Sequence, residues 1–333
     1  MAGDFYWREN MKKMMFVLLM MVTIMLFSKP LTVYTYESMG WIQDSLVEQF
    51  ENQNDCELRV VKLGDAGNVL SRLMLEKNNP RADVVLGLDQ SLTLKAVEED
   101  LLEKTTPGNL SNIEKDEYLF DKTGHVYPYD YGAIAVIYNP EEIEGELISF
   151  NDLTQYEDSL IIQDPRSSST GQAFLLWTIA VHGDNWKEFW QKLKPAVLTV
   201  TSGWTEAFSK FETGEAPMMV SYATDGAYSY HYYGSSRYRA FIPGEGAYLQ
   251  IEGVGVVKGT DQKALATHFI EFVLSDPFQK AVPLNQWMFP VKDVELPDAF
   301  KHAVKPEKIV LLESAEIQEN MDRWLDEWER IMY

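Results

Sequence analysis

Residues 82–88 read ADVVLGL, an almost unbroken apolar run. Such a run is typical of a strand that is buried on both faces of a parallel sheet. The chain before it alternates between strand and helix patterns, at 31–36 (strand), 42–52 (helix), 57–63 (strand) and 68–76 (helix). This order predicts a doubly wound α/β lobe, whose ligands bind at the carboxyl ends of the strands.

A second alternation of strands and helices follows and predicts a second α/β lobe. We expect strands at 133–138, 159–163, 197–201, 218–222 and 248–257, and helices at 173–182, 204–212, 263–274 and 314–331. Extended crossovers near Ala133 and near Leu249 would join the lobes. Lobe 1 is then predicted to hold residues 29–133 and 249–333, and lobe 2 residues 134–248, which suits a chain of 333 residues.

The formal net charge of −22 makes this an acidic protein. Nucleic acid binding requires a basic face that neutralises phosphates, so we expect no nucleic acid partner. A small cationic ligand is compatible with the acidity. Cys56 is the only cysteine, so an intramolecular disulfide is excluded and the core must supply the stability.

The N-terminus has the pattern of an export signal. Lys12 and Lys13 precede an unbroken apolar run over 14–27. The run is shorter than the roughly 20 residues that a membrane span needs, and it fits the apolar region of a secretory signal. Residues 1–28 are therefore predicted to be a signal peptide or, because Leu26 makes a poor cleavage site, a retained anchor. We expect an exported, periplasmic protein.

A tyrosine-rich segment, SYATDGAYSYHYYG, occupies residues 221–234. A core segment would contain branched aliphatic residues, which close packing needs. Tyrosines among Ser, Thr, Asp and Gly indicate either an edge strand with a turn or the wall of a cleft. A cleft of this kind would suit a flat, polar, cationic ligand, because aromatic faces attract positive charge.

Other candidate ligand contacts lie in turns between strands and helices. Residues 163–171 read QDPRSSSTG directly before a predicted helix, where free backbone N–H groups and hydroxyls can bind an anion, or where a serine simply caps the helix. Asp65 follows the second strand and is either a helix cap or an acceptor for a ligand amine. Trp204 and Trp287 lie in comparable turns, which indicates a ligand contact or a lobe interface.

Motifs of common enzymes are missing from the chain. The sequence contains no GxSxG, HExxH, GxxxxGK[ST] or CxxC motif. Its five histidines show no metal-ligand spacing: His125, His182, His231, His268 and His302. We therefore expect neither an enzyme nor a metal site.

Seven motifs occur in an order and spacing that resemble a known family. They are LTVYTYES, ADVVLGLD, YPYDYG, QDPRSSSTG, SGWTEAF, VSYAT and QWMFPV. From about Lys29 to the end, the chain resembles the periplasmic thiamine-binding proteins that feed ABC importers. The resemblance implies the type II periplasmic binding protein fold, in which two α/β lobes, each a doubly wound sheet, are joined by crossover hinge strands and close on the ligand.

The resemblance also implies a function and a set of ligand contacts. The protein would be a monomer that captures thiamine, thiamine monophosphate or thiamine diphosphate and delivers it to ABC permease subunits, without a cofactor. The implied contacts are Tyr36, Asp65, Ala66, Ser168, Ser169, Trp204, Tyr222, Ala223, Thr224, Asp225, Gly226, Tyr228 and Trp287. The chain departs from the family at Asp225 and Gly226, which replace a serine and a proline, and at Ala66, which replaces a glycine. These departures leave the preferred form of thiamine open.

Two alternatives remain at this point. A ferric-iron carrier of the same fold would use adjacent tyrosines as ligands, here Tyr232 and Tyr233. A thiamine-degrading enzyme of the same fold would use a cysteine nucleophile, for which only Cys56 is available. Tyr230, Tyr232 and Tyr233 are otherwise expected at the rim of the cleft or in packing contacts.

Overall fold

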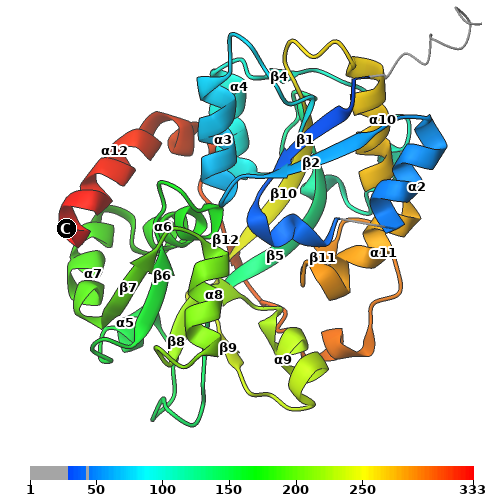
Figure 1. Cartoon of the computed structure of the whole chain (residues 1–333). Helices are drawn as coiled ribbons and strands as arrows, with labels where there is room; N and C mark the ends of the chain where they lie inside the picture. The colour runs from blue at the N-terminus through cyan, green and yellow to red at the C-terminus, as the bar shows by residue number, and fades with distance from the viewer. Residues whose placement is uncertain (1–28, 43–44) are drawn as a thin grey trace, which may run out of the picture.

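Two long antiparallel strands, β5 (Val126–Tyr138) and β10 (Ala247–Val257), cross the middle of the molecule (Figure 1). The computed structural model describes residues 29–42 and 45–333. The strand order is β2-β1-β3-β10-β5-β8-β6-β7, so β10 and β5 connect three strands on one side to three on the other. We call the β2-β1-β3 side lobe 1 and the β8-β6-β7 side lobe 2. The predicted α/β fold with two crossover strands is confirmed.

Lobe 1 is built on three parallel strands, of which β1 and β3 are buried on both faces. Every residue of β1 and β3 is buried, as the apolar run at 82–88 predicts. The strands are β1 (Leu31–Thr35), β2 (Leu58–Lys62) and β3 (Val84–Asp89). The helices that cover them are α2 (Ser45–Asn54), α3 (Ala66–Leu75), α4 (Gln90–Glu98), α10 (Lys263–Val273) and α11 (Asp276–Asn285).

Lobe 2 packs its strands against a central helix that is buried over most of its length. Most residues of α6 (Ser169–His182) are buried, because the helix lies inside the lobe and contacts β6, β8 and α7. The strands are β6 (Leu160–Gln163), β7 (Val197–Thr201) and β8 (Met218–Tyr222). The other helices are α5 (Phe150–Leu153), α7 (Trp186–Leu193), α8 (Trp204–Glu212) and α9 (Asp225–Tyr233).

The C-terminal helix α12 (Ser314–Met332) contacts α7 of lobe 2 and α4 of lobe 1, and its buried face belongs to the apolar core of lobe 2. Ile317, Trp324, Trp328 and Met332 recur at helical spacing and form one buried face. Trp328 meets Trp190 of α7 edge to face, with ring centroids 5.8 Å apart. Large aromatic surfaces on both helices account for this packing. The lobe boundaries, with residues 29–133 and 249–333 in lobe 1 and 134–248 in lobe 2, stay a prediction.

Residues 225–233 of the tyrosine-rich segment form helix α9, whereas one of the two sequence interpretations was an edge strand with a turn. The small residues of α9, Gly226 and Ala227, face inward, and a Cβ at Gly226 would lie 2.4 Å from the backbone oxygen of His302. Close packing against the 3-10 helix η6 (Asp298–His302) therefore decides the conformation, because aromatic residues have only moderate helix propensity. Tyr230, Tyr232 and Tyr233 are exposed.

Short elements complete the fold. They are η1 (Glu37–Trp41), β4 (Leu102–Glu103), η2 (Leu110–Asn112), η3 (Asp116–Tyr118), η4 (Gly183–Asn185), η5 (Lys194–Ala196), β9 (Arg239–Phe241), β11 (Phe289–Pro290) and β12 (Ile309–Val310). Within residues 29–42 and 45–333, no helix has the length and apolar character of a membrane span. The signal peptide or anchor predicted over residues 1–28 lies outside the described residues.

Candidate functional site

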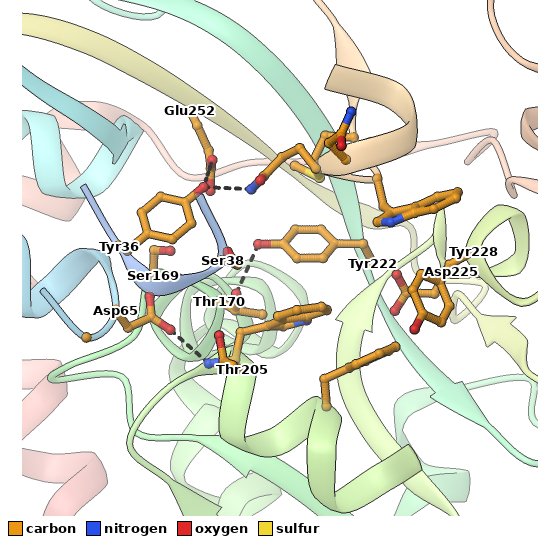
Figure 2. A pocket seen from close by; sticks show the side chains of 17 residues that line it. Tyr36, Ser38, Asp65, Ser169, Thr170, Thr205, Tyr222, Asp225, Tyr228 and Glu252 are labelled. Carbon is orange, nitrogen blue, oxygen red and sulfur yellow. Dashed lines mark hydrogen bonds between the residues drawn. The ribbon is translucent and has the colours of Figure 1, made fainter. Parts of the chain in front are cut away.

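A cavity of about 320 Å³ lies between the two lobes (Figure 2), within the size range of small-molecule sites. Side chains from both lobes and from β10 line it. They are Tyr36, Ser38, Gly64, Asp65, Ser169, Thr170, Trp204, Thr205, Phe208, Tyr222, Asp225, Tyr228, Glu252, Asn285, Gln286, Trp287 and Met288.

Lobe 1 contributes residues at the carboxyl ends of its parallel strands, as the strand order predicts. Tyr36 follows β1, and Asp65 follows β2. The Tyr36 ring lies against Gly87, where an added Cβ would come within 2.1 Å of the ring and where φ is +103°. Only glycine meets both requirements at this position. The Tyr36 hydroxyl donates to the Glu252 carboxylate and accepts from Gln286 Nε2 at 2.8 Å (Figure 2).

The carboxylate of Asp65 is hydrogen-bonded both to helix α3 and to lobe 2. Its side chain caps α3 by accepting from the N–H of Ala66 at 2.6 Å. Its other carboxylate oxygen accepts from the backbone N–H of Trp204, in lobe 2, at 2.8 Å (Figure 2). Burial raises the pKa of Asp65, whereas hydrogen bonds from Trp204, Ala66 and Ser168 lower it.

The serine-rich turn places the N-terminus of α6 at the cavity. Ser168 is the N-cap, and its hydroxyl accepts from the N–H of Gly171 at 3.3 Å. Ser169 and Thr170, in the first turn, line the cavity, and the Thr170 hydroxyl lies 3.0 Å from the Tyr222 hydroxyl. The helix dipole favours an oxygen-rich or anionic group there. The sequence left open whether this turn caps a helix or contacts a ligand. In the structure Ser168 caps the helix, and Ser169 lines the cavity.

Aromatic rings form the wall on the lobe 2 side. Trp204 and Phe208 are stacked with ring centroids 4.7 Å apart, and Phe208 meets Tyr228 edge to face at 5.0 Å. Tyr228 in turn meets Trp287 edge to face at 5.2 Å. Trp287 has a φ of +59°, a conformation that costs a bulky residue energy and that tends to occur at functional sites.

Asp225 ends a hydrogen-bonded chain behind this wall. The Trp204 indole N–H donates to the Ser221 hydroxyl at 2.9 Å, and that hydroxyl donates to the Asp225 carboxylate. Asp225 is 2% exposed and lines the cavity. Burial raises the pKa of Asp225 to about 7, against the lowering effect of the Ser221 hydrogen bond.

The charged side chains of the cavity are all acidic. Asp65, Asp225 and Glu252 line it, and no Lys, Arg or His belongs to the lining among the residues that the structure describes. Carboxylates and aromatic faces both attract a cation, and more strongly where water is excluded. The arrangement therefore suits a flat ligand that carries a positive charge.

Most, but not all, of the predicted contacts reach the cavity. Those that line it are Tyr36, Asp65, Ser169, Trp204, Tyr222, Asp225, Tyr228 and Trp287. Those that are buried outside the lining are Ala66, Ser168, Ala223, Thr224 and Gly226. The first two belong to helix caps, and the last three turn into the packing beneath α9. Their roles as ligand contacts stay predictions.

Sequence reasoning missed other lining residues, notably Phe208, Glu252 and Gln286. Phe208 follows Trp204 by four residues, so it lies on the same helix face. Glu252 is a single acid within the apolar strand pattern of β10, which was a usable signal. No local pattern indicates Gln286, because only the tertiary fold brings its side chain to Tyr36.

The comparisons with known proteins agree with this geometry. Residues 79–320 match the family described as bacterial extracellular solute-binding protein. The thiamine-binding periplasmic protein of Escherichia coli is 36% identical over 94% of this chain and 97% of its own length. The chain belongs to the thiamine-binding periplasmic protein family. The corresponding Brucella melitensis protein is 38% identical over 90% of each chain.

A solved structure extends the match to three dimensions. A periplasmic thiamin binding protein superposes with a TM-score of 0.85 at 34% identity, over 91% of this chain and 96% of its own. The described residues contain no group of three or more His, Cys, Asp or Glu side chains placed to hold a metal ion. Tyr232 and Tyr233, the tyrosine pair of the iron-carrier alternative, do not line the cavity.

Proposed function

We propose that this protein captures thiamine, or a phosphate ester of thiamine, between its lobes and delivers it to an ABC permease. The observation that carries the proposal is the cavity itself, which combines an aromatic wall with three carboxylates and no basic side chain among the described residues. Family membership supports the same ligand, since the relatives are named for binding thiamine.

Each part of thiamine has a suitable partner in the cavity. The thiazolium ring is a permanent cation, which Tyr36, Tyr228 and Trp287 attract by about 1 kcal/mol per ring when desolvated. The aminopyrimidine carries an amino group for which Asp65 is an acceptor. The hydroxyethyl arm, with or without phosphate, suits the N-terminus of α6 at Ser169 and Thr170.

Capture is proposed to proceed by closure of the lobes about β5 and β10. In the present structure Asp65 of lobe 1 and Trp204 of lobe 2 are hydrogen-bonded, so the lobes are already in contact beside the cavity. Opening would break this contact and admit the ligand. We infer that the closed complex docks on the permease from the periplasmic side, as a monomer.

Transport is proposed to occur without chemistry on the ligand. Cys56, the only thiol, does not line the cavity. Burial and the neighbouring carboxylates Glu51 and Asp55 raise the pKa of the Cys56 thiol, which opposes formation of a nucleophilic thiolate. We therefore propose a binding protein and not an enzyme.

A fluorescence titration tests the proposal. Trp204 and Trp287 line the cavity, so thiamine binding should change tryptophan emission in a saturable way. The recovered ligand should be intact thiamine. Cleaved pyrimidine and thiazole fragments would favour the enzyme, and an unchanged spectrum together with unchanged thermal stability would refute thiamine binding.

A further inference from the structure

Three acidic residues lie side by side on neighbouring strands, and the middle one lines the cavity. In the sheet register, Glu252 of β10 is paired with Asp89 of β3 on one side and with Asp130 of β5 on the other. We call Asp89, Glu252 and Asp130 the acidic row. Like charges directly opposite one another destabilise a sheet, so three ionised carboxylates at these positions need compensation.

The protein compensates the members of the row unequally. Asp89 accepts hydrogen bonds from the Leu92 N–H, the Ser91 hydroxyl and the Gln250 amide, whereas Asp130 accepts none from the residues that the structure describes. The three side chains are at most 3% exposed. In the described part of the chain, no salt bridge joins any of them to a basic residue, and neither carboxylate oxygen of Asp130 has a hydrogen-bond partner. A buried carboxylate without a partner is costly when ionised, and it therefore tends to keep a proton.

Glu252 connects this row to the ligand cavity. Its carboxylate lines the cavity and accepts hydrogen bonds from the hydroxyl groups of Tyr36 and Tyr129, the latter at 2.7 Å. Tyr36 lines the same cavity (Figure 2). A positive charge placed there would lie close to Glu252, with only neutral polar groups between them.

We propose that the acidic row is the counter-charge for the cationic ring of the ligand, and that it gives up a proton to the solvent when the cation binds. This inference rests on the proposed function, because it takes the ligand to be thiamine. It assigns Glu252 as the residue that distinguishes a cationic from a neutral ligand. Asp130, which does not line the cavity, acts through Glu252 as a positioning residue.

The titratable groups that face Glu252 support this assignment. Burial, with Asp89 and Asp65 as lesser causes, raises the pKa of Glu252 to about 7, against the lowering effect of the hydrogen bonds from Tyr36 and Tyr129. Burial, with Glu252 as a second cause, raises the pKa of Asp130 far above its usual range. Burial also raises the pKa of Asp89 to about 6. Tyr222 on β8 also faces Glu252, and burial keeps it neutral by raising its pKa.

Calorimetry in two buffers of different ionisation enthalpy measures the proton directly. At pH 6.5 we expect the wild-type protein to release more than half a proton per thiamine bound, and at pH 9 almost none. The apparent affinity should rise about tenfold from pH 6 to pH 8, because one group that titrates near neutral pH competes with the ligand.

Two matched variants identify the source of the proton. Glu252→Gln keeps a hydrogen-bond acceptor and removes the charge, so we expect most of the proton release and the rise in affinity to disappear. Asp225→Asn removes the cavity's other carboxyl that titrates near neutral pH, and we expect the proton release to persist. The reverse pattern, with release lost in Asp225→Asn and kept in Glu252→Gln, would overturn the proposal. If Glu252→Gln does not fold, Tyr129→Phe replaces it. This variant removes a hydrogen bond to the Glu252 carboxylate that lowers the pKa of Glu252, so we expect the rise in affinity to move to higher pH, and an unchanged pH profile would overturn the proposal.

The failure of this inference is distinguishable from failure of the proposed function. Thiamine binding without proton release at pH 6.5 would overturn the role of the acidic row and leave the proposed function intact. No thiamine binding at any pH would overturn both.

Discussion

The carboxylate of Asp65 in lobe 1 accepts a hydrogen bond of 2.8 Å from the backbone N–H of Trp204 in lobe 2. The same carboxylate caps α3, and the Trp204 ring stacks on Phe208 in the cavity wall. One hydrogen bond thus connects a helix cap, the contact between the lobes and the aromatic side of the cavity. Substitutions here should affect ligand binding more than folding.

Asp65→Ala should weaken thiamine binding at least tenfold, because it removes both the acceptor for the ligand amine and the hydrogen bond between the lobes, each worth about 1–2 kcal/mol. Tryptophan fluorescence titration measures the affinity. Asn68→Ala is the matched control, since Asn68 completes the same capping box and does not line the cavity. Equal losses of thiamine affinity in both variants would show that capping of α3, and not a contact with the ligand or with lobe 2, explains the effect.

Gly203→Ala should hinder closure of the lobes. Gly203 has an extended backbone, with φ −170°, which alanine adopts freely, but its Cβ would lie 2.8 Å from the Asp65 carboxylate. We expect at least a tenfold loss of thiamine affinity with thermal stability nearly unchanged. Gly108→Ala is the control, because it is exposed and meets only the end of the Glu271 side chain. Wild-type affinity in Gly203→Ala would argue against the observed closed arrangement in the complex.

Trp287→Ala should reduce thiamine affinity at least tenfold, since a desolvated aromatic face contributes about 1 kcal/mol or more to a cation and the ring also excludes water. Trp287→Phe keeps an aromatic ring, so it should reduce thiamine affinity less than Trp287→Ala does. Tyr233→Ala is the control, because this tyrosine is exposed and does not line the cavity. A binding isotherm shifted as strongly by Tyr233→Ala would contradict the assignment of the cavity.

Asp225→Asn should change how stability depends on pH. Burial raises the pKa of Asp225 to about 7, so the folded state favours the neutral carboxyl and is penalised as pH rises through 7. The variant lacks this penalty, and its unfolding temperature relative to wild type should rise by a few degrees between pH 5 and pH 8. Thermal unfolding followed by circular dichroism measures this. The exposed Glu48→Gln should show no such trend, and a pH-independent difference for Asp225→Asn would refute a raised pKa.

Local patterns predicted the elements that carry the cavity. The apolar run at 82–88 identified a doubly buried strand, and Asp65 and Trp204, which the strand-to-helix turns indicated as candidates, line the cavity. These predictions succeed because periodicity and turn chemistry are local properties. Family resemblance supplied Tyr228, and it favoured a ligand contact for Trp204 and Trp287, whose turns alone left a ligand contact and a lobe interface open.

Long-range packing decided what the sequence did not predict. The tyrosine-rich segment became a helix because Gly226 and Ala227 pack against η6. Helix α12 packs against α7 through Trp328 and Trp190. The acidic row arises from three distant segments that the sheet register aligns, and no local pattern connects Asp89 to Asp130.

A calorimetric titration with thiamine, thiamine monophosphate and thiamine diphosphate tests the central claim most directly. We predict saturable one-to-one binding of thiamine that is lost or strongly weakened in Asp65→Ala and Trp287→Ala. The order of affinities among the three forms would then identify the preferred ligand. The absence of saturable heat for all three at ligand concentrations up to roughly millimolar, from a folded protein, would contradict thiamine binding.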